Sequence, residues 1–95
     1  SDPRIWICAP SPMVLETPGL GPERVNGLTT RKPRLRELIG FIKKVAEEKN
    51  VGFIDLNTPL DHRLALFTEK DGVHPNKKGY FAIAKQVYQE IKPEN

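Results

Sequence analysis

The sequence contains little cysteine, little serine and no long apolar run. A single cysteine, Cys8, cannot form an internal disulfide, which excludes a disulfide-stabilised scaffold. Because Cys8 lies in a short apolar run, we expect its thiol to be buried and inert. No apolar run approaches the roughly 20 residues that a membrane-spanning helix requires. The sequence therefore predicts no membrane span.

Length and charge narrow the class of protein further. The chain has 95 residues, which allow at most one domain with a small core. Its 15 Lys and Arg against 12 Asp and Glu give a net charge of +3, spread over several segments, so we expect no nucleic-acid partner. The two histidines, His62 and His74, are too few for a metal site even with Asp71 beside them. We expect no metal and no cofactor.

Two short apolar runs predict buried strands. Residues 5–9 are rich in β-branched and aromatic side chains and are followed by Pro10, a pattern typical of a strand that is buried on both faces. Residues 51–56 repeat this pattern. Between the two runs, the proline- and glycine-rich residues 10–33 predict a long irregular connection of the kind that is usually functional or disordered.

Helical periodicity follows each predicted strand. Residues 34–49 predict an amphipathic helix that ends at Asn50, and its apolar face consists of Leu35, Leu38, Ile39, Ile42, Val45 and Ala46. Residues 77–91 predict a second helix with an inner stripe made of Tyr80, Ala84, Val87, Tyr88 and Ile91.

Alternation of strands and helices indicates a parallel sheet with a right-handed crossover. Two parallel strands alone are too few, because such a sheet needs helices on both faces and neighbours for its strands. We therefore expect this chain either to pair with a second copy or to be the second half of a larger α/β domain.

The segment DGVHPN, residues 71–76, stands directly before the second helix. Pro75 keeps His74 out of the helical conformation, Asn76 is a suitable helix cap, and Gly72 allows a sharp turn. Asp71 can then accept a hydrogen bond from one ring nitrogen of His74 and leave the other free to take a proton from a hydroxyl. The same residues are also ordinary loop and cap residues, so a purely structural role stays open.

Residues 71–84, DGVHPNKKGYFAIA, resemble the last block of the SGNH or GDSL-type hydrolases, in which an Asp-x-x-His pair precedes Pro, Asn and an apolar helix. VGFIDLNTPL and RIWICAP are similar to the last two sheet strands of that fold. The resemblance implies an α/β fold: the last two parallel strands and helices of a three-layer α/β/α, flavodoxin-like sandwich. Residues 1–95 would be the C-terminal portion of one such domain, and its N-terminal portion would lie outside this chain.

The same resemblance implies a carboxylic-ester hydrolase in which His74 is the general base and Asp71 its orienting acid. No stretch of the sequence resembles the nucleophile block, and Ser11, between two prolines, is a loop residue in this interpretation. The chain alone would then be incomplete and inactive, and its partner would be the N-terminal half of the hydrolase. The substrate would be a small-molecule or carbohydrate ester, with O-acetyl groups on carbohydrate as one candidate.

The proline- and glycine-rich segment follows the first strand, at the edge of a parallel sheet where ligands bind. We expect it to form a wall of the substrate pocket, with Met13, Val14, Leu15 and Arg24 as substrate contacts.

Two hypotheses compete with the hydrolase: a non-catalytic α/β interaction module that self-associates through its sheet edge, and a basic nucleic-acid binder with salt-dependent affinity. The sequence does not indicate the compartment.

Overall fold

The structure, a computed structural model, describes residues 5–92. Its elements are strand β1 (Trp6–Ala9), helix α1 (Pro22–Lys49), strand β2 (Gly52–Asp55), the 3₁₀ helix η1 (Leu64–Leu66) and helix α2 (Lys77–Ile91). β1 and β2 pair in parallel, in a register that places Trp6 opposite Gly52 and Ala9 opposite Asp55. The predicted order of strand, helix, strand and helix and the parallel pairing are confirmed.

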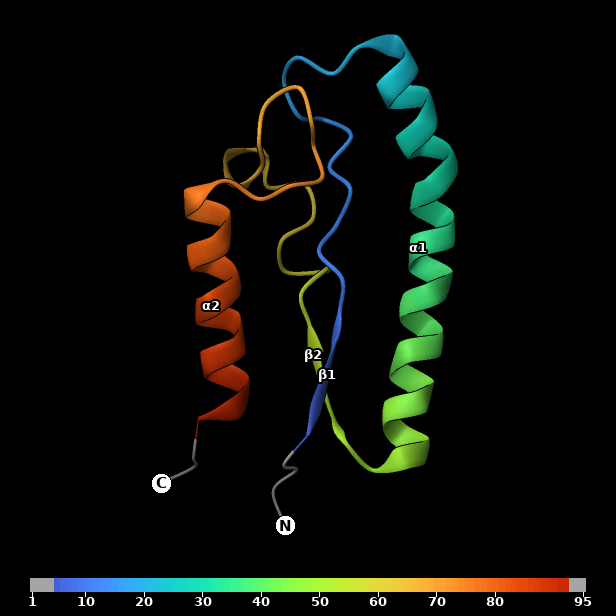
Figure 1. Ribbon diagram of the computed structural model, residues 1–95, viewed down its shortest axis with the longest axis vertical. Helices are drawn as coiled ribbons and strands as arrows, with labels where there is room; N and C mark the ends of the chain where they lie inside the picture. Colours follow the sequence, from blue (N-terminus) through green and yellow to red (C-terminus); the bar gives the residue numbers. More distant parts are fainter. Residues whose placement is uncertain (1–4, 93–95) are drawn as a thin grey trace.

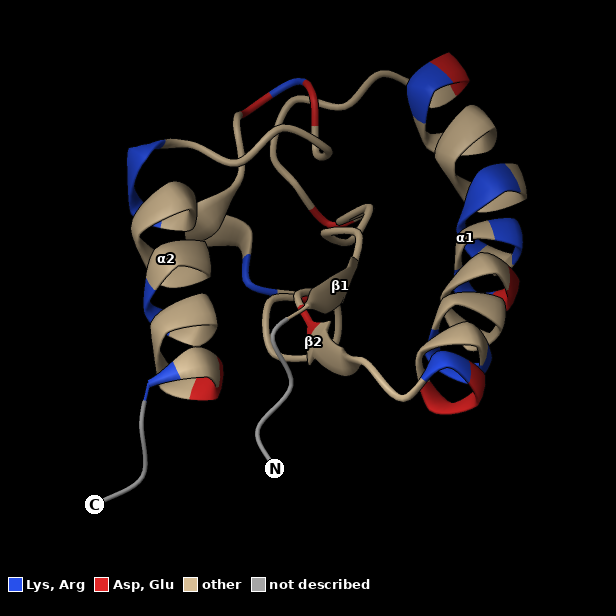
Figure 2. Cartoon of the chain, turned by 60° about the horizontal axis from the view of Figure 1, so that its bottom comes forward, with Lys and Arg blue, Asp and Glu red and all other residues tan. Residues whose placement is uncertain are grey.

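The two helices lie on opposite sides of the strand pair (Figures 1 and 2). Both strands run toward the end of the molecule that also holds the connections 10–21 and 56–76 and the first turns of both helices (Figure 1). The molecule measures 48 × 26 × 14 Å. Its thinness along the shortest axis reflects a sheet of only two strands, β1 and β2, in the described residues.

Helix α1 begins at Pro22, so the prediction that residues 10–33 are irregular is wrong for their second half. Pro22 stands in the first turn, where its missing N–H costs nothing, whereas Pro33 lies inside the helix, where a proline is usually disruptive. Tertiary contacts offset that cost, because Leu28 is fully buried and Lys32 donates to Met13 O and Asp61 Oδ1, which lie outside the helix. The end at Asn50, in the left-handed conformation (φ 55°, ψ 45°), is as predicted.

Helix α2 has the predicted bounds, but of its predicted inner stripe Val87 alone is half-buried, and Tyr80, Ala84, Tyr88 and Ile91 are exposed. Tyr80 and Tyr88, which we expected to face the core, are 59% and 64% exposed. The buried and half-buried positions are Gly79, Ala82, Ile83, Gln86 and Val87. The sequence pattern was misleading because the chain has apolar residues on both faces of this helix, and periodicity alone does not tell which face the rest of the fold covers.

Cys8 is exposed, so the expectation of a buried thiol is wrong. In the register of the sheet Cys8 stands opposite Ile54, so the two side chains project from the same face, yet Ile54 is only 1% exposed. Helix α1 contacts both strands, whereas α2 contacts β2 but not β1. The face of β1 that carries Cys8 is therefore uncovered in the described chain.

The core joins the loops at the carboxyl ends of the strands to helix α2. Val14, Leu60, Leu66 and Phe67 form its buried centre, against which Leu56, Ala82 and Ile83 pack. This cluster fixes the segment that carries Asp71 and His74 relative to α2. None of the helices within residues 5–92 is long and apolar enough to cross a membrane.

Candidate active site

The segment from Phe67 to Asn76 is a closed loop that delivers His74 to the start of α2. Phe67 and Pro75 form an antiparallel bridge, and the N–H of Thr68 donates to the carbonyl of His74 at 2.9 Å. At the tip the N–H of Gly72 donates to Thr68 O at 3.0 Å, and Gly72 adopts φ 77°, which favours glycine. The turn that the sequence predicted at Gly72 is confirmed.

A second loop holds this one in place. Val14 N donates to Gly72 O at 2.8 Å, and Lys70 N donates to Pro18 O at 2.9 Å. A Cβ atom at Gly72 would come within 2.8 Å of Val14 O, so the close approach also requires glycine. The proline-rich segment after β1 therefore supports the Asp71–His74 loop directly.

Asp71 and His74 form the pair that the sequence predicted. Asp71 Oδ2 lies 2.9 Å from His74 Nδ1, and Asp71 Oδ1 accepts from the backbone N–H of His74 at 2.8 Å and of Val73 at 2.7 Å. In the described residues Nε2 of His74 has no partner, and the side chain is 72% exposed. The ring is thus oriented at Nδ1 and free at Nε2.

The carboxylate of Asp71 is held in its charged form. Partial burial favours the neutral acid, but hydrogen bonds from the His74 N–H, the His74 ring and the Val73 N–H outweigh burial and lower the pKa of Asp71 to about 2. Asp71 is therefore an acceptor at all physiological pH values, as an orienting acid must be.

The helix cap is a separate function of Asn76. Its Oδ1 accepts from Gly79 N at 2.9 Å, and its Nδ2 donates to Ala65 O at 2.8 Å. Because Asn76 accepts from a free backbone N–H in the first turn of α2, His74 is not needed as a cap. A structural role for DGVHPN therefore explains Asn76 and the backbone contacts of Asp71 Oδ1, but it does not require the contact between Asp71 Oδ2 and the ring of His74.

The other histidine has a different environment. His62 Nδ1 pairs with Glu16 Oε2, and its Nε2 lies 3.5 Å from Asp61 Oδ2, so both ring nitrogens face carboxylates. The hydrogen bond from His62 lowers the pKa of Glu16. Since both nitrogens of His62 face carboxylates, His74 is the better candidate for a base.

A family model described as GDSL-like lipase/acylhydrolase matches residues 3–87. The chain belongs to this family. The match covers both strands, α1 and the Asp71–His74 loop, which confirms the resemblance noted in the sequence. No match was found among curated proteins or among solved structures.

The four predicted substrate contacts of this GDSL-like chain lie in different environments. Val14 is 0% exposed and belongs to the core, so its side chain offers no surface to a substrate. Met13 and Leu15 are half-buried, and neither lines the groove beside Thr68 and Asn76 or the hollow beside Lys32. Arg24 contacts Asp71: its Nε donates to Asp71 O at 3.2 Å, and its Nη2 lies 3.6 Å from Asp71 Oδ1.

A groove of about 610 Å³ adjoins the His74 loop. Its lining consists of Pro18, Leu64, Ala65, Phe67, Thr68, Glu69 and Asn76. Thr68 and Asn76 connect it to the site, because Thr68 bonds to His74 and Asn76 follows two residues later. The sequence did not point to Leu64 or Ala65, since only tertiary contacts bring them beside the loop.

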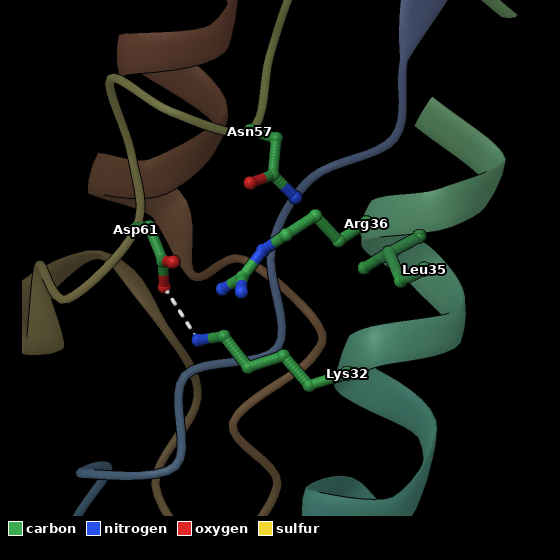
Figure 3. Close-up of a pocket in the computed structure, with 5 residues that line it drawn as sticks. All are labelled: Lys32, Leu35, Arg36, Asn57 and Asp61. Carbon is green, nitrogen blue, oxygen red and sulfur yellow. Dashed lines mark hydrogen bonds and ion pairs between the residues drawn. The ribbon is translucent and has the colours of Figure 1, made fainter. Parts of the chain in front are cut away.

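A second hollow, between α1 and the segment after β2, is too small for a substrate. Lys32, Leu35 and Arg36 line it from α1, with Asn57 and Asp61 opposite (Figure 3). Lys32 Nζ donates to Asp61 Oδ1 at 2.8 Å and to Met13 O at 2.6 Å. The hollow has a volume of about 10 Å³, which is enough for a single water molecule, so we assign it a structural role.

Residues 5–92 contain no group of three His, Cys, Asp or Glu side chains that could hold a metal ion.

Proposed function

We propose that this chain supplies the His-Asp part of a Ser-His-Asp triad in a carboxylic-ester hydrolase. The observation that carries the proposal is the pair Asp71 Oδ2–His74 Nδ1 at 2.9 Å, with Nε2 of His74 free of partners among residues 5–92, in a chain of the GDSL-like lipase/acylhydrolase family. A base whose orientation is fixed at one nitrogen and whose other nitrogen is exposed has the arrangement that serine activation needs.

In the proposed reaction His74 acts twice. Its Nε2 takes the proton of a serine hydroxyl as the serine oxygen forms a bond to the ester carbonyl carbon. The resulting imidazolium then gives that proton to the leaving alcohol as the C–O ester bond breaks. Water repeats the two steps on the acyl-enzyme, which releases the acid and restores the serine. Asp71, charged throughout, stabilises the imidazolium and holds the ring.

We propose that the nucleophile comes from the N-terminal portion of the same hydrolase domain, present as a separate polypeptide segment. The chain has two serines, Ser1 and Ser11, and Ser11 makes no hydrogen bond to His74 in the described residues. The uncovered face of β1 at Cys8 and the exposed apolar side chains of both helices give such a segment surface to cover. These side chains are Leu38, Phe41, Val45, Tyr80, Phe81, Tyr88 and Ile91.

The groove beside the His74 loop is the proposed place for the acyl or alcohol part of the substrate. The groove is lined by the apolar residues Pro18, Leu64, Ala65 and Phe67, which suit a small apolar group. Thr68, Glu69 and Asn76 add polar atoms to the lining. A small-molecule ester or an O-acetylated carbohydrate fits this mixed lining.

Native mass spectrometry with a serine-reactive fluorophosphonate tests the proposal. The purified protein is measured before and after exposure to the probe, alongside His74→Ala as control. A bound companion polypeptide that gains one adduct in wild type, and reacts far more slowly with the His74→Ala chain, supports the proposal. Multiples of this chain without any adduct contradict it and favour the self-associating interaction module.

A further inference from the structure

The strongest unassigned contact near the site comes from Arg24. Its guanidinium reaches from the first turn of α1 to a residue 47 positions later in the chain, and touches Asp71 at two points. Nε donates to the backbone carbonyl of Asp71, and Nη2 approaches the carboxylate oxygen that Val73 and His74 also contact. The side chain is 35% exposed, so the contact is partly shielded from water.

The backbone contact is the more informative one. In the described residues no other group donates to the carbonyl of Asp71, and this peptide leads directly into Gly72 at φ 77°. A guanidinium holds a fixed, planar array of N–H donors, so one side chain can orient a carbonyl and a neighbouring carboxylate together. Arg24 therefore acts on the peptide plane of Asp71 and on its carboxylate at once.

We infer that Arg24 is a positioning residue for the Asp71–His74 pair rather than a substrate contact. Together with the N–H groups of Val73 and His74 that hold Oδ1, it keeps the carboxylate of Asp71 turned so that Oδ2 accepts from Nδ1 of His74. This orientation leaves Nε2 without a proton and able to act as a base. The inference rests on the proposed esterase function for its catalytic meaning. The effect of Arg24 on the orientation of Asp71 and His74 can be measured on this chain without any substrate.

The test is the tautomer of neutral His74, read from long-range ¹H–¹⁵N NMR spectra of the chain. Wild type is compared with Arg24→Met, which keeps the aliphatic stem and removes every donor, and with Arg24→Lys. The matched control is Arg34→Met, since Arg34 is an exposed arginine on the same helix with no side-chain hydrogen bond or ion pair in the described residues. His62, paired with Glu16 and Asp61, is an internal control in each spectrum.

We expect the Nδ1–H tautomer to dominate in wild type and in Arg34→Met, and to fall at least roughly twofold in Arg24→Met. Arg24→Lys should lie between them, because one ammonium group cannot make both contacts. An unchanged tautomer ratio in folded Arg24→Met overturns the inference, even where the melting temperature falls. If Arg24→Met does not fold, a wild-type ratio in Arg24→Lys overturns it.

Separate measurement of kcat and KM in the assembled enzyme distinguishes a positioning role of Arg24 from substrate binding. Arg24→Met should lower kcat and leave KM nearly unchanged, because the base is misoriented but the groove is intact. A raised KM with unchanged kcat would instead make Arg24 a substrate contact and overturn the inference. Failure of the fluorophosphonate experiment would count against the esterase and leave the tautomer result standing.

Discussion

Oδ2 of Asp71 lies 2.9 Å from Nδ1 of His74, while Oδ1 of the same carboxylate accepts two backbone N–H groups of the turn. One carboxylate thus builds the loop and orients the ring. The fold and the proposed chemistry therefore both depend on the side chain of Asp71. Stability measurements test its role in the fold, and activity measurements test its role in the chemistry.

Replacement of His74 by Ala should reduce ester hydrolysis by the assembled enzyme by roughly 10³-fold or more, because the base is lost. The measurement is kcat/KM for a p-nitrophenyl ester. His62→Ala is the control, since Nδ1 of His62 pairs with Glu16, its Nε2 lies near Asp61, and it has no part in the proposed reaction. Equal losses in the two variants would contradict the assignment of His74.

Acid should destabilise the chain as Asp71 takes up a proton. The pKa of Asp71 is lowered from 3.8 to about 2, so its unfolded form binds a proton at a higher pH than its folded form does. The stabilisation is therefore complete above pH 3.8 and is lost as the pH falls toward about 2.

Urea unfolding across this range measures the loss, with Asp71→Asn for comparison. The variant should be less stable at neutral pH, and its stability should depend less on pH in the acid range. The slope that remains is expected from Asp55 and Glu16, whose pKa values are also lowered. Identical pH profiles for wild type and Asp71→Asn would show that the turn does not depend on the charged carboxylate.

Gly79→Ala should destabilise the packing of α2 against η1. An added Cβ at Gly79 would collide with the carbonyl oxygen of Leu66, and neither helix turn can move without disturbing the core. We expect a cost of about 1–3 kcal/mol in the free energy of unfolding. Gly40→Ala is the matched control: nothing lies within 4 Å of its added Cβ, so it should stabilise the chain by about 0.4–1 kcal/mol.

Leu28→Ala should destabilise the first half of α1 by about 2–5 kcal/mol, because Leu28 is fully buried there. Leu38→Ala on the same helix should cost less than about 1 kcal/mol, since Leu38 is 49% exposed. Hydrogen exchange localises the effect: Leu28→Ala should lose protection around residues 22–33 first. Uniform loss of protection along α1 would mean that its two halves are not held independently.

The strands, the second helix and the Asp71–His74 pair could be read from the sequence because they depend on local rules. A short β-branched run that ends at a proline predicts a strand, and Pro75 and Asn76 mark the start of α2 through the backbone angles and hydrogen bonds they allow. The spacing of three residues, with Gly72 free to adopt a positive φ between them, allows a turn that brings Asp71 within reach of His74. These features need no knowledge of the rest of the chain.

Only the tertiary structure decided where α1 begins, which face of α2 is inward and what Arg24 contacts. Prolines and glycines gave residues 22–33 a low helical propensity, which burial of Leu28 and the anchoring of Lys32 override. Arg24 meets Asp71 because two loops at the carboxyl ends of the strands hydrogen-bond to each other through Val14 and Gly72. Local sequence sets backbone angles, but contacts between distant residues depend on how the whole chain packs.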